Sequence, residues 1–307
     1  MRASLGIFAA AVFLAGCAPY TTEEATLANY QLQVVERGRA GASVLMVPLH
    51  GIIAPDEGSA PAAIAMLRQL RSEGRPRGIK AVILHVDSPG GDVTTSDVLA
   101  EEVRKCQAKG IKVVAFFGDT AASGAYYASA GADRIVARPT SISGSIGVIM
   151  MHFDAQKLLV EKVGVRDESI VSGPYKEVPS VFRPMTAEER AYLQNIVDQL
   201  YGRFVKTVAD GRKLKEADVR KLADGRVYLA EEAKRLGLID EIGQRDEAIA
   251  AARKLAGEDS TVIAYYHQPG LLAELFRSQA RANPVPEELE TLASMALHPR
   301  LLYLWRP

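Results

Sequence analysis

The feature that most constrains the fold is a unit that occurs twice between residues 79 and 133. Two apolar runs, residues 79–87 and 112–117, have the length and composition of buried strands. Each is followed by a turn of small residues and then by a helical pattern. This succession predicts a layered α/β domain with mostly parallel strands. Functional sites in such sheets gather at the strand ends, which is where both turns fall.

The second turn presents a serine. Residues 116–133 read Phe-Phe-Gly-Asp-Thr-Ala-Ala-Ser-Gly-Ala-Tyr-Tyr-Ala-Ser-Ala-Gly-Ala-Asp, so Ser123 lies between the strand and a small-residue helix. A serine there can expose its hydroxyl while the N–H of Gly124 points into the same space and receives developing negative charge. Taken alone, however, Ser123 is better interpreted as the N-cap of the helix, a position that serine favours.

The same criteria predict the remaining elements. Strands are expected at residues 43–51, 133–137, 145–150, 227–229 and 261–266, the last of which closes the sheet. Helices are expected at residues 60–71, 93–109, 155–163, 186–210, 215–222, 230–236 and 246–255. Pro48 indicates that the first strand is irregular or lies at an edge. Thr186 and Glu189 form a capping-box signature.

Segments rich in turn formers separate these elements. Residues 138–144 and 171–179 are expected to be loops, the second of them exposed. The final segment, residues 268–307, has helical patterns at 271–281 and 287–295 and an apolar ending. We expect this ending to pack on the domain, and contact with a neighbouring subunit or with the bilayer is the alternative.

The first residues have the pattern of a targeting signal. A basic start precedes an apolar run from Leu5 to Ala15, which is too short to span a bilayer, and Leu14-Ala15-Gly16-Cys17 follows. This resembles a bacterial lipoprotein signal peptide ending in a lipobox, which implies cleavage before Cys17 and lipidation of its thiol. An ordinary secretory signal with a chance cysteine is the alternative. The expected organisation is a signal peptide at 1–16, a tether at 17–42, one folded domain at 43–267 and a helical extension at 268–307.

Composition limits the possible partners. Lys and Arg together number 37, as do Asp and Glu, and the formal net charge of zero argues against nucleic acid as a main partner. After Cys17 only Cys106 remains, which we expect to act as a small hydrophobic residue in a helix. No metal-ligand spacing and no phosphate-binding glycine loop is present, so no cofactor or metal is expected. Asp92 and Asp119 fit the roles of caps or turn formers.

A serine nucleophile needs a base, which is usually histidine. The sequence holds His50, His85, His152, His267 and His298. His152 follows Ser123 most closely, but its neighbours Met150 to Asp154 match no catalytic histidine motif. A structural role is therefore favoured for all five histidines, and a Ser-His-Asp arrangement with His152 is kept as a minor alternative.

Four motifs together are more specific. They are Ser88-Pro-Gly-Gly91, Thr120-Ala-Ala-Ser-Gly-Ala-Tyr-Tyr-Ala128 with Ala132-Asp133, Ser143-Gly-Ser-Ile-Gly-Val148, and Ser172-Gly-Pro-Tyr-Lys176. Their order and spacing resemble the signal peptide peptidase A family of Ser/Lys-dyad serine peptidases, over about Val44 to Leu255. The resemblance implies a crotonase-like and Clp-protease-like fold, serine endopeptidase activity on hydrophobic peptides such as remnant signal peptides, and a homo-oligomeric ring or dome.

The same resemblance implies the catalytic pair. Ser123 corresponds to the nucleophile and Lys176 to the general base, with Ser145 orienting the lysine. The pair is 53 residues apart, so the fold has to bring the two together. A free lysine ammonium has a pKa of about 10.4 and accepts no proton at neutral pH, so the site has to lower that value by desolvation. Pro174 and Glu177 depart from the family's usual residues, but neither change removes a catalytic atom.

The resemblance also implies an oxyanion hole. Gly124 matches one donor position, and Gly90 and Gly91 match the other, with Gly91 the preferred second donor. The implied location is the bacterial cell envelope, where the protein is lipid-anchored and extracytoplasmic, on the periplasmic face if there are two membranes. Which membrane holds the anchor is left open.

Two other functions remain as alternatives. A crotonase-type enzyme would use the glycine N–H groups on a thioester oxyanion, but acyl-CoA is cytoplasmic and the export signal argues against it. A catalytically silent scaffold lipoprotein is the other alternative.

Overall fold

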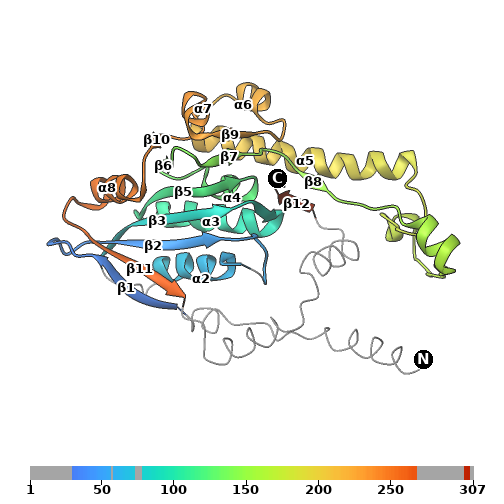
Figure 1. Ribbon diagram of the computed structural model, residues 1–307, viewed down its shortest axis with the longest axis horizontal. Coiled ribbons are helices and arrows are strands. Elements are labelled where there is room, and N and C mark those ends of the chain that lie inside the picture. Colours follow the sequence, from blue (N-terminus) through green and yellow to red (C-terminus); the bar gives the residue numbers. More distant parts are fainter. Residues whose placement is uncertain (1–29, 57, 73–77, 268–300, 305–307) are drawn as a thin grey trace.

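The computed structural model describes residues 30–56, 58–72, 78–267 and 301–304. Within this part, nine strands form one sheet whose central strands run parallel in the order β11, β2, β3, β5, β6, β10 (Figure 1). Their bounds are β2 (Ser43–His50), β3 (Ile79–Ser88), β5 (Lys112–Ala122), β6 (Arg134–Ala137), β10 (Glu241–Ile242) and β11 (Thr261–His267). The α/β class and the mostly parallel pairing are confirmed.

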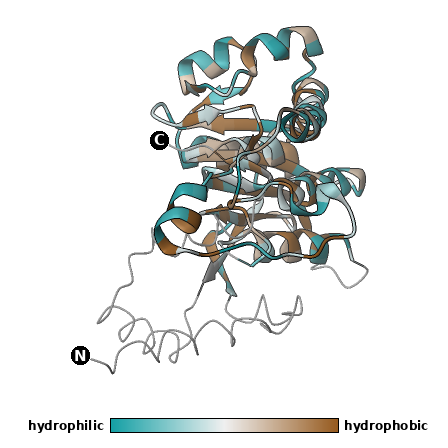
Figure 2. Cartoon of the chain, turned by 90° about the vertical axis from the view of Figure 1, so that its right-hand side faces the viewer, coloured by the Kyte–Doolittle hydropathy of each residue, from teal (hydrophilic) through white to brown (hydrophobic). Residues whose placement is uncertain are grey.

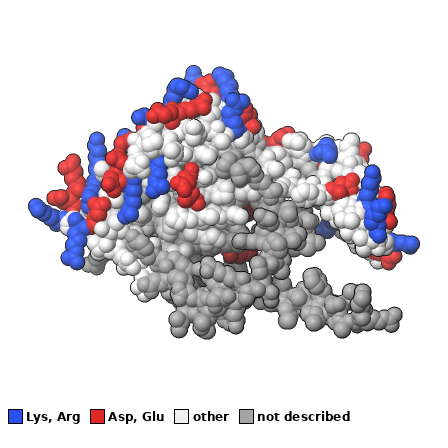
Figure 3. All heavy atoms as spheres, in the orientation of Figure 1, with Lys and Arg blue, Asp and Glu red and all other residues white. Residues whose placement is uncertain are grey.

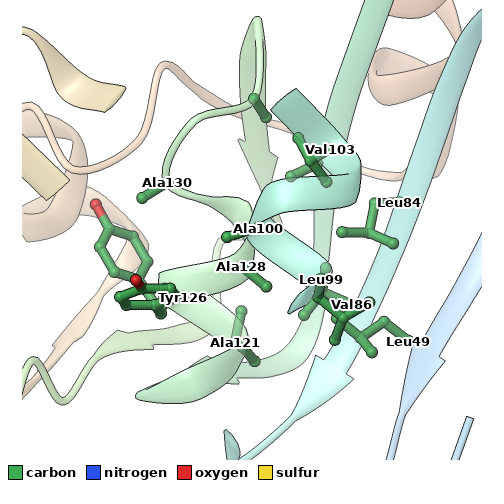
Figure 4. Close-up of a cluster of buried hydrophobic side chains, with 14 of the residues drawn as sticks. Leu49, Leu84, Val86, Leu99, Ala100, Val103, Ala121, Tyr126, Ala128 and Ala130 are labelled. Atoms are coloured by element: carbon green, nitrogen blue, oxygen red, sulfur yellow. The ribbon is translucent and has the colours of Figure 1, made fainter. Parts of the chain in front are cut away.

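Helices cover both faces of this sheet. The helices α2 (Ala60–Arg71), α3 (Val93–Ala108) and α4 (Gly124–Ser129) share one core with alternate strand residues such as Val82 and Leu84. The helix α8 (Arg245–Ala256) packs on the other face against Ala81 and Ile83. Figure 4 shows Leu84 and Val86 of β3 beside Leu99 and Val103 of α3. Because both faces are buried, β3 is apolar along most of its length.

The second half of the chain is mainly helical. The helix α5 (Ala187–Arg212) begins with the predicted capping box, in which the Glu189 N–H donates to Thr186 Oγ1 at 3.2 Å and the Thr186 N–H donates to Glu189 Oε2 at 2.9 Å. The helices α6 (Glu216–Leu222) and α7 (Ala230–Arg235) flank β9 (Val227–Leu229). Within the part of the chain that the structure describes, no helix is both long and apolar enough to cross a membrane.

The region around the serine differs from the sequence-based expectation. β5 continues to Ala122 instead of ending at residue 117, because β7 (Ile142–Gly144) pairs with Thr120–Ala122 and extends the sheet. The single strand expected at residues 145–150 is wrong: β7 and β8 (Ile149–Met150) lie on either side of Ser145, whose φ is 48°. Tertiary pairing with β5 and β9 overrides the turn-forming composition of residues 138–144.

Two N-terminal features also differ. β1 (Tyr30–Glu36) pairs antiparallel with β11, although these residues lie in the segment expected to be a tether. β2 lies inside the sheet, so the edge position suggested by Pro48 is wrong for the strand as a whole. Among the described residues, however, β11 pairs only with Ser43–Met46 of β2, so at Pro48 the strand pairs with β3 alone. A residue without an N–H is tolerated there.

Between β8 and α5 the chain forms an arm, residues 151–186. The helix expected at 155–163 is a π-helix, Lys157–Val163, which stops at Gly164 with a left-handed φ of 78°. Figure 1 shows this arm extending past the sheet to the free end of α5. Residues 171–179 are exposed or half-buried, as predicted, and contain a short 3₁₀ turn, Pro174–Glu177.

The apolar ending packs on the domain, as expected. β12 (Leu301–Leu304) lies between β4 (Gly90–Asp92) and β8 and runs antiparallel to both. The helical patterns at 271–281 and 287–295, the signal peptide at 1–16 and Cys17 lie outside the described residues.

Surface and interior follow the usual division. Figure 2 shows hydrophobic colour along the strands of the interior and hydrophilic colour on outward turns of the helices. On the face shown in Figure 3, acidic and basic side chains are interspersed, in keeping with the zero net charge.

Packing in the middle of β5 sets a stability test. Phe117 is fully buried in the main core, and we expect Phe117→Ala to lower the free energy of unfolding by about 3–5 kcal/mol. Phe153 in the arm is 46% exposed, and Phe153→Ala is expected to cost less than about 1 kcal/mol. Chemical denaturation measures both, and equal losses for the two variants would contradict this description of the core.

Candidate active site

Two strand ends meet at the centre of the site. β3 ends at Ser88, whose Oγ accepts a hydrogen bond from the Gly90 N–H at 3.1 Å. Gly90 has a φ of 96°, and a Cβ there would lie 2.6 Å from the Gly124 nitrogen and 3.0 Å from the Ala122 oxygen. Both the backbone angle and the space therefore require glycine. This close approach places the end of β5 and the start of α4 directly beside β4.

Ser123 sits at the junction of β5 and α4 in a strained conformation. Its φ is 53° and its ψ −118°, an uncommon backbone state for a residue with a side chain. The Ser123 N–H donates to the Gly144 oxygen at 2.8 Å, which anchors the turn to β7. The side chain makes no capping hydrogen bond to α4. Ser123 therefore occupies the N-cap position of α4, as predicted, but its hydroxyl does not cap the helix.

The serine faces a cavity of about 470 Å³. Its lining includes Ser123, Ser145, Val148, Val197, Tyr201 and Leu304. Ser145 is nearly buried, and its N–H donates to the Arg226 oxygen at 2.8 Å, which holds it in its left-handed turn. The sequence analysis did not predict that residues of α5 and β12 would line the site. The apolar ending of the sequence was the only signal that could have indicated β12.

The glycine N–H groups converge at the same place. The Gly90 oxygen accepts from the Ile53 N–H at 2.8 Å, and the Asp92 N–H donates to the Ile53 oxygen at 2.6 Å. Because strand groups alternate, the Gly91 N–H points to the opposite side. There the Gly91 nitrogen lies 3.2 Å from where a Cβ of Gly124 would be. The Gly124 N–H is in the first turn of α4, where backbone donors lack intrahelical partners.

The three predicted glycines thus have two different roles: two present N–H donors, and one allows the backbone segments to approach closely. Gly91 and Gly124 hold N–H groups close together, an arrangement that suits an oxyanion. Gly90 has its N–H engaged by Ser88, so its geometry fits a space-making role instead of a donor role.

Lys176 lies elsewhere in this chain. It belongs to the 3₁₀ turn of the arm, its side chain is exposed, and it is not among the residues that line the Ser123 cavity. The turn is held against α5 by the rings of Tyr175 and Tyr192, whose centroids are 5.0 Å apart. One chain therefore brings together Ser123, Ser145 and the two glycine donors without the lysine.

The described histidine side chains also lie away from the cavity lining. His50 and His85 contact each other, with ring centroids 4.8 Å apart, and His85 stacks on Phe116 at 5.2 Å. Burial, reinforced by the neighbouring His50, lowers the pKa of His85 to about 4. His85 alternates along β3 with Val86, so it faces the side of α8. His152 lies at the start of the arm and does not line the cavity.

Asp92 and Cys106 have the structural roles expected of them, whereas Asp119 lies within β5 and is not the predicted cap or turn former. Asp92 caps α3 by accepting from the N–H of Thr95 at 2.7 Å. Asp119 is exposed and pairs with Arg138 at 3.4 Å. Cys106 is fully buried in α3, where desolvation raises the pKa of its thiol to about 11.

Comparison with known proteins identifies the family of this chain. A family model described as "Peptidase family S49" matches residues 105–259. "Putative protease MJ0651" of Methanocaldococcus jannaschii is 44% identical, and the match covers 61% of this chain and 60% of that protein. "Putative protease slr0021" of Synechocystis is 39% identical over 70% of this chain and 75% of that protein. "Putative signal peptide peptidase SppA" of Enterococcus faecium is 36% identical, with coverages of 76% and 70%.

Fold and site together define an α/β protein with a strained serine at a strand-to-helix turn beside two glycine N–H groups. The chain belongs to peptidase family S49, the members of which are serine peptidases and therefore hydrolases. A solved structure of a mutant of the "1510-N membrane-bound stomatin-specific protease" shares 15% identity at a TM-score of 0.46 and covers 69% of this chain and 85% of that one. That likeness is too distant to bear on the site.

The contact between Gly90 and Gly124 sets a second test. Gly90→Ala adds a methyl group where the Gly124 backbone lies, in a left-handed conformation, and is expected to destabilise the fold by about 1–3 kcal/mol. Gly131→Ala is the matched control, because a Cβ at Gly131 meets nothing within 4 Å. Thermal unfolding compares the two variants. If Gly90→Ala melts at the temperature of Gly131→Ala, the close approach described above is incorrect.

Proposed function

We propose that this protein is a membrane-anchored serine endopeptidase that cleaves hydrophobic peptides through an acyl-enzyme on Ser123. The observation that carries the proposal is the strained Ser123 turn, which faces a cavity without capping its helix. The cavity walls include Val148 and Val197, which suit apolar peptide side chains. A relative with 36% identity is named a signal peptide peptidase, and remnant signal peptides are the substrate class that we infer here.

The reaction would proceed in two steps. Ser123 Oγ attacks the peptide carbonyl carbon while Lys176 Nζ takes the hydroxyl proton, and the carbonyl oxygen becomes an oxyanion facing the N–H groups of Gly91 and Gly124. Collapse breaks the C–N bond, and the leaving amine receives the proton from Lys176. Lys176 then takes a proton from water, whose oxygen attacks the acyl carbon. Collapse breaks the ester bond to Ser123 Oγ, which receives the proton back from Lys176.

This chemistry needs Lys176 in a place that one chain does not provide. A lysine serves as a base only when it is neutral, which requires that it be taken out of water. The arm that carries Lys176 exposes apolar side chains, including Leu158 at 61%, Val163 at 63% and Ile170 at 101%. We propose that these side chains are covered by a second copy of the chain in a homo-oligomer, and that the arm delivers Lys176 to the Ser123 cavity of that copy.

Activity assays test the catalytic pair. With the soluble form that begins at Ala18 and a fluorogenic hydrophobic peptide, Ser123→Ala and Lys176→Ala should each lower kcat/KM by about 10³-fold or more, because each removes a group of the reaction itself. His152→Ala and Lys162→Ala, the second an exposed lysine of the same arm, should stay near wild type. Wild-type rates in both Ser123→Ala and Lys176→Ala would refute the assignment.

A mixing experiment distinguishes whether the Lys176 that acts on Ser123 belongs to the same chain or to a neighbouring copy. Ser123→Ala and Lys176→Ala subunits, each inactive alone, should recover about a quarter of wild-type activity when co-assembled at random in equal amounts. That fraction follows if each site needs a serine from one copy and a lysine from its neighbour. No recovery in a demonstrably mixed oligomer would show that Lys176 acts within its own chain.

The membrane anchor is tested through Cys17. Cys17→Ala should move the protein from the membrane pellet to the soluble fraction, because two or more acyl chains on the thiol and amino group hold such an anchor in the bilayer. Cys106→Ala is the matched control and should stay with the membrane. Fractionation and intact mass measure both, and an unchanged pellet fraction for Cys17→Ala would contradict the lipoprotein assignment.

A further inference from the structure

A buried serine of α3 lies between the two backbone segments that carry the glycine donors. Ser96 is fully buried and is not among the residues that line the Ser123 cavity. Its hydroxyl donates to the Asp92 oxygen at 2.8 Å. Because Asp92 directly follows Gly91, this hydrogen bond holds one end of the segment that presents the Gly91 N–H.

The same hydroxyl lies against the backbone of Gly124. Ser96 Oγ is the atom nearest to the position that a Cβ of Gly124 would take, and the Gly91 nitrogen is 3.2 Å from that position. Gly124 begins α4 and is not one of the glycines with a positive φ among the described residues. The serine hydroxyl, and not the backbone angle, therefore requires glycine at residue 124.

Other contacts of the Gly91 segment act on its opposite side. The Ile53 N–H donates to the Gly90 oxygen at 2.8 Å, and the Asp92 N–H donates to the Ile53 oxygen at 2.6 Å. These bonds fix the segment relative to Ile53 but leave its distance from α4 to be set by packing. Of the three atoms nearest to the Cβ position of Gly124, only Ser96 Oγ belongs to a side chain.

The separation of the two donors matters for the proposed chemistry. N–H groups stabilise an oxyanion best when they are held in advance at hydrogen-bonding distance from the place where the charge develops. Small displacements of such groups lower the rate strongly. In a close-packed interior, loss of one atom from the space between the two segments allows both to shift.

We propose that Ser96 is a positioning residue for the reaction at Ser123, and that its hydroxyl, bonded to Asp92 and packed on Gly124, sets the separation of the Gly91 and Gly124 N–H groups. The proposal rests on the proposed peptidase function and deepens it. Ser96 acts through the backbone and touches no reacting atom. Its loss therefore weakens stabilisation of the transition state and leaves binding of the peptide unchanged.

Kinetics of Ser96→Ala test this role against a matched control. Ser129 of α4 is equally buried, and its hydroxyl also donates to the oxygen four residues earlier, that of Ala125, at 2.7 Å. With a fluorogenic hydrophobic peptide, Ser96→Ala should lower kcat about tenfold and change KM by less than about twofold. Ser129→Ala loses the same kind of hydrogen bond and should keep kcat within about twofold of wild type. Equal kcat values for the two variants would overturn the proposal.

A double-mutant cycle tests the contact without any activity. Gly124→Ala places a methyl group against Ser96 Oγ and should lower the melting temperature by about 4 °C or more. In the Ser96→Ala background the oxygen is gone, and the same Gly124→Ala change should lower the melting temperature by less than half as much. Equal shifts in the two backgrounds would show that the hydroxyl does not pack on Gly124, and would overturn the proposal.

The two measurements separate failure of this proposal from failure of the proposed function. An active wild type and an unchanged kcat in Ser96→Ala would overturn the positioning role alone. A wild type without peptidase activity would overturn the proposed function and the positioning role together. The melting temperatures decide in either case whether Ser96 excludes a side chain at residue 124.

Discussion

The close approach of two backbone turns is the constraint on which the rest of the structure depends. The Gly90–Gly91 segment and the Ser123–Gly124 segment come within a distance that no side chain between them would permit. That contact puts two backbone N–H groups beside one serine, and β7 secures it through the hydrogen bond from Ser123 to Gly144. The helices buried on both faces of the sheet make the two strand ends rigid enough to hold a strained residue in place.

The parts that the proposed chemistry requires are distributed unequally. The nucleophile and the glycine donors are built on buried strands, whereas Lys176 is carried on an exposed arm. A charged lysine is stable in water and costs free energy when buried alone. On the proposed function, Lys176 is exposed to water in an isolated chain, and packing of the arm against another copy completes the site.

Particular elements show how far the sequence can be interpreted. The apolar runs at β3 and β5 predicted the parallel sheet because burial on both faces leaves few polar residues. Composition misled at residues 138–144, where β7 takes its hydrogen bonds from β5 and β9, which are far away in the chain. β1 was missed for a different reason. Apolar and polar residues alternate from Tyr30 to Val34, as in a strand, but the partner strand β11 lies more than two hundred residues later in the chain.

The sequence by itself determined the α/β class, the strand-to-helix turn at Ser123 and the glycines beside it, because these depend on local patterns and on backbone conformations that few residues adopt. Only the tertiary structure decided that Gly90 makes space while Gly91 presents its N–H, that Lys176 lies outside the cavity, and that Ser96 lies against Gly124. Those outcomes depend on which distant backbone groups pair and on what each side chain meets when it is buried. Pairing and burial between segments far apart in the chain leave almost no local signal in the amino-acid order.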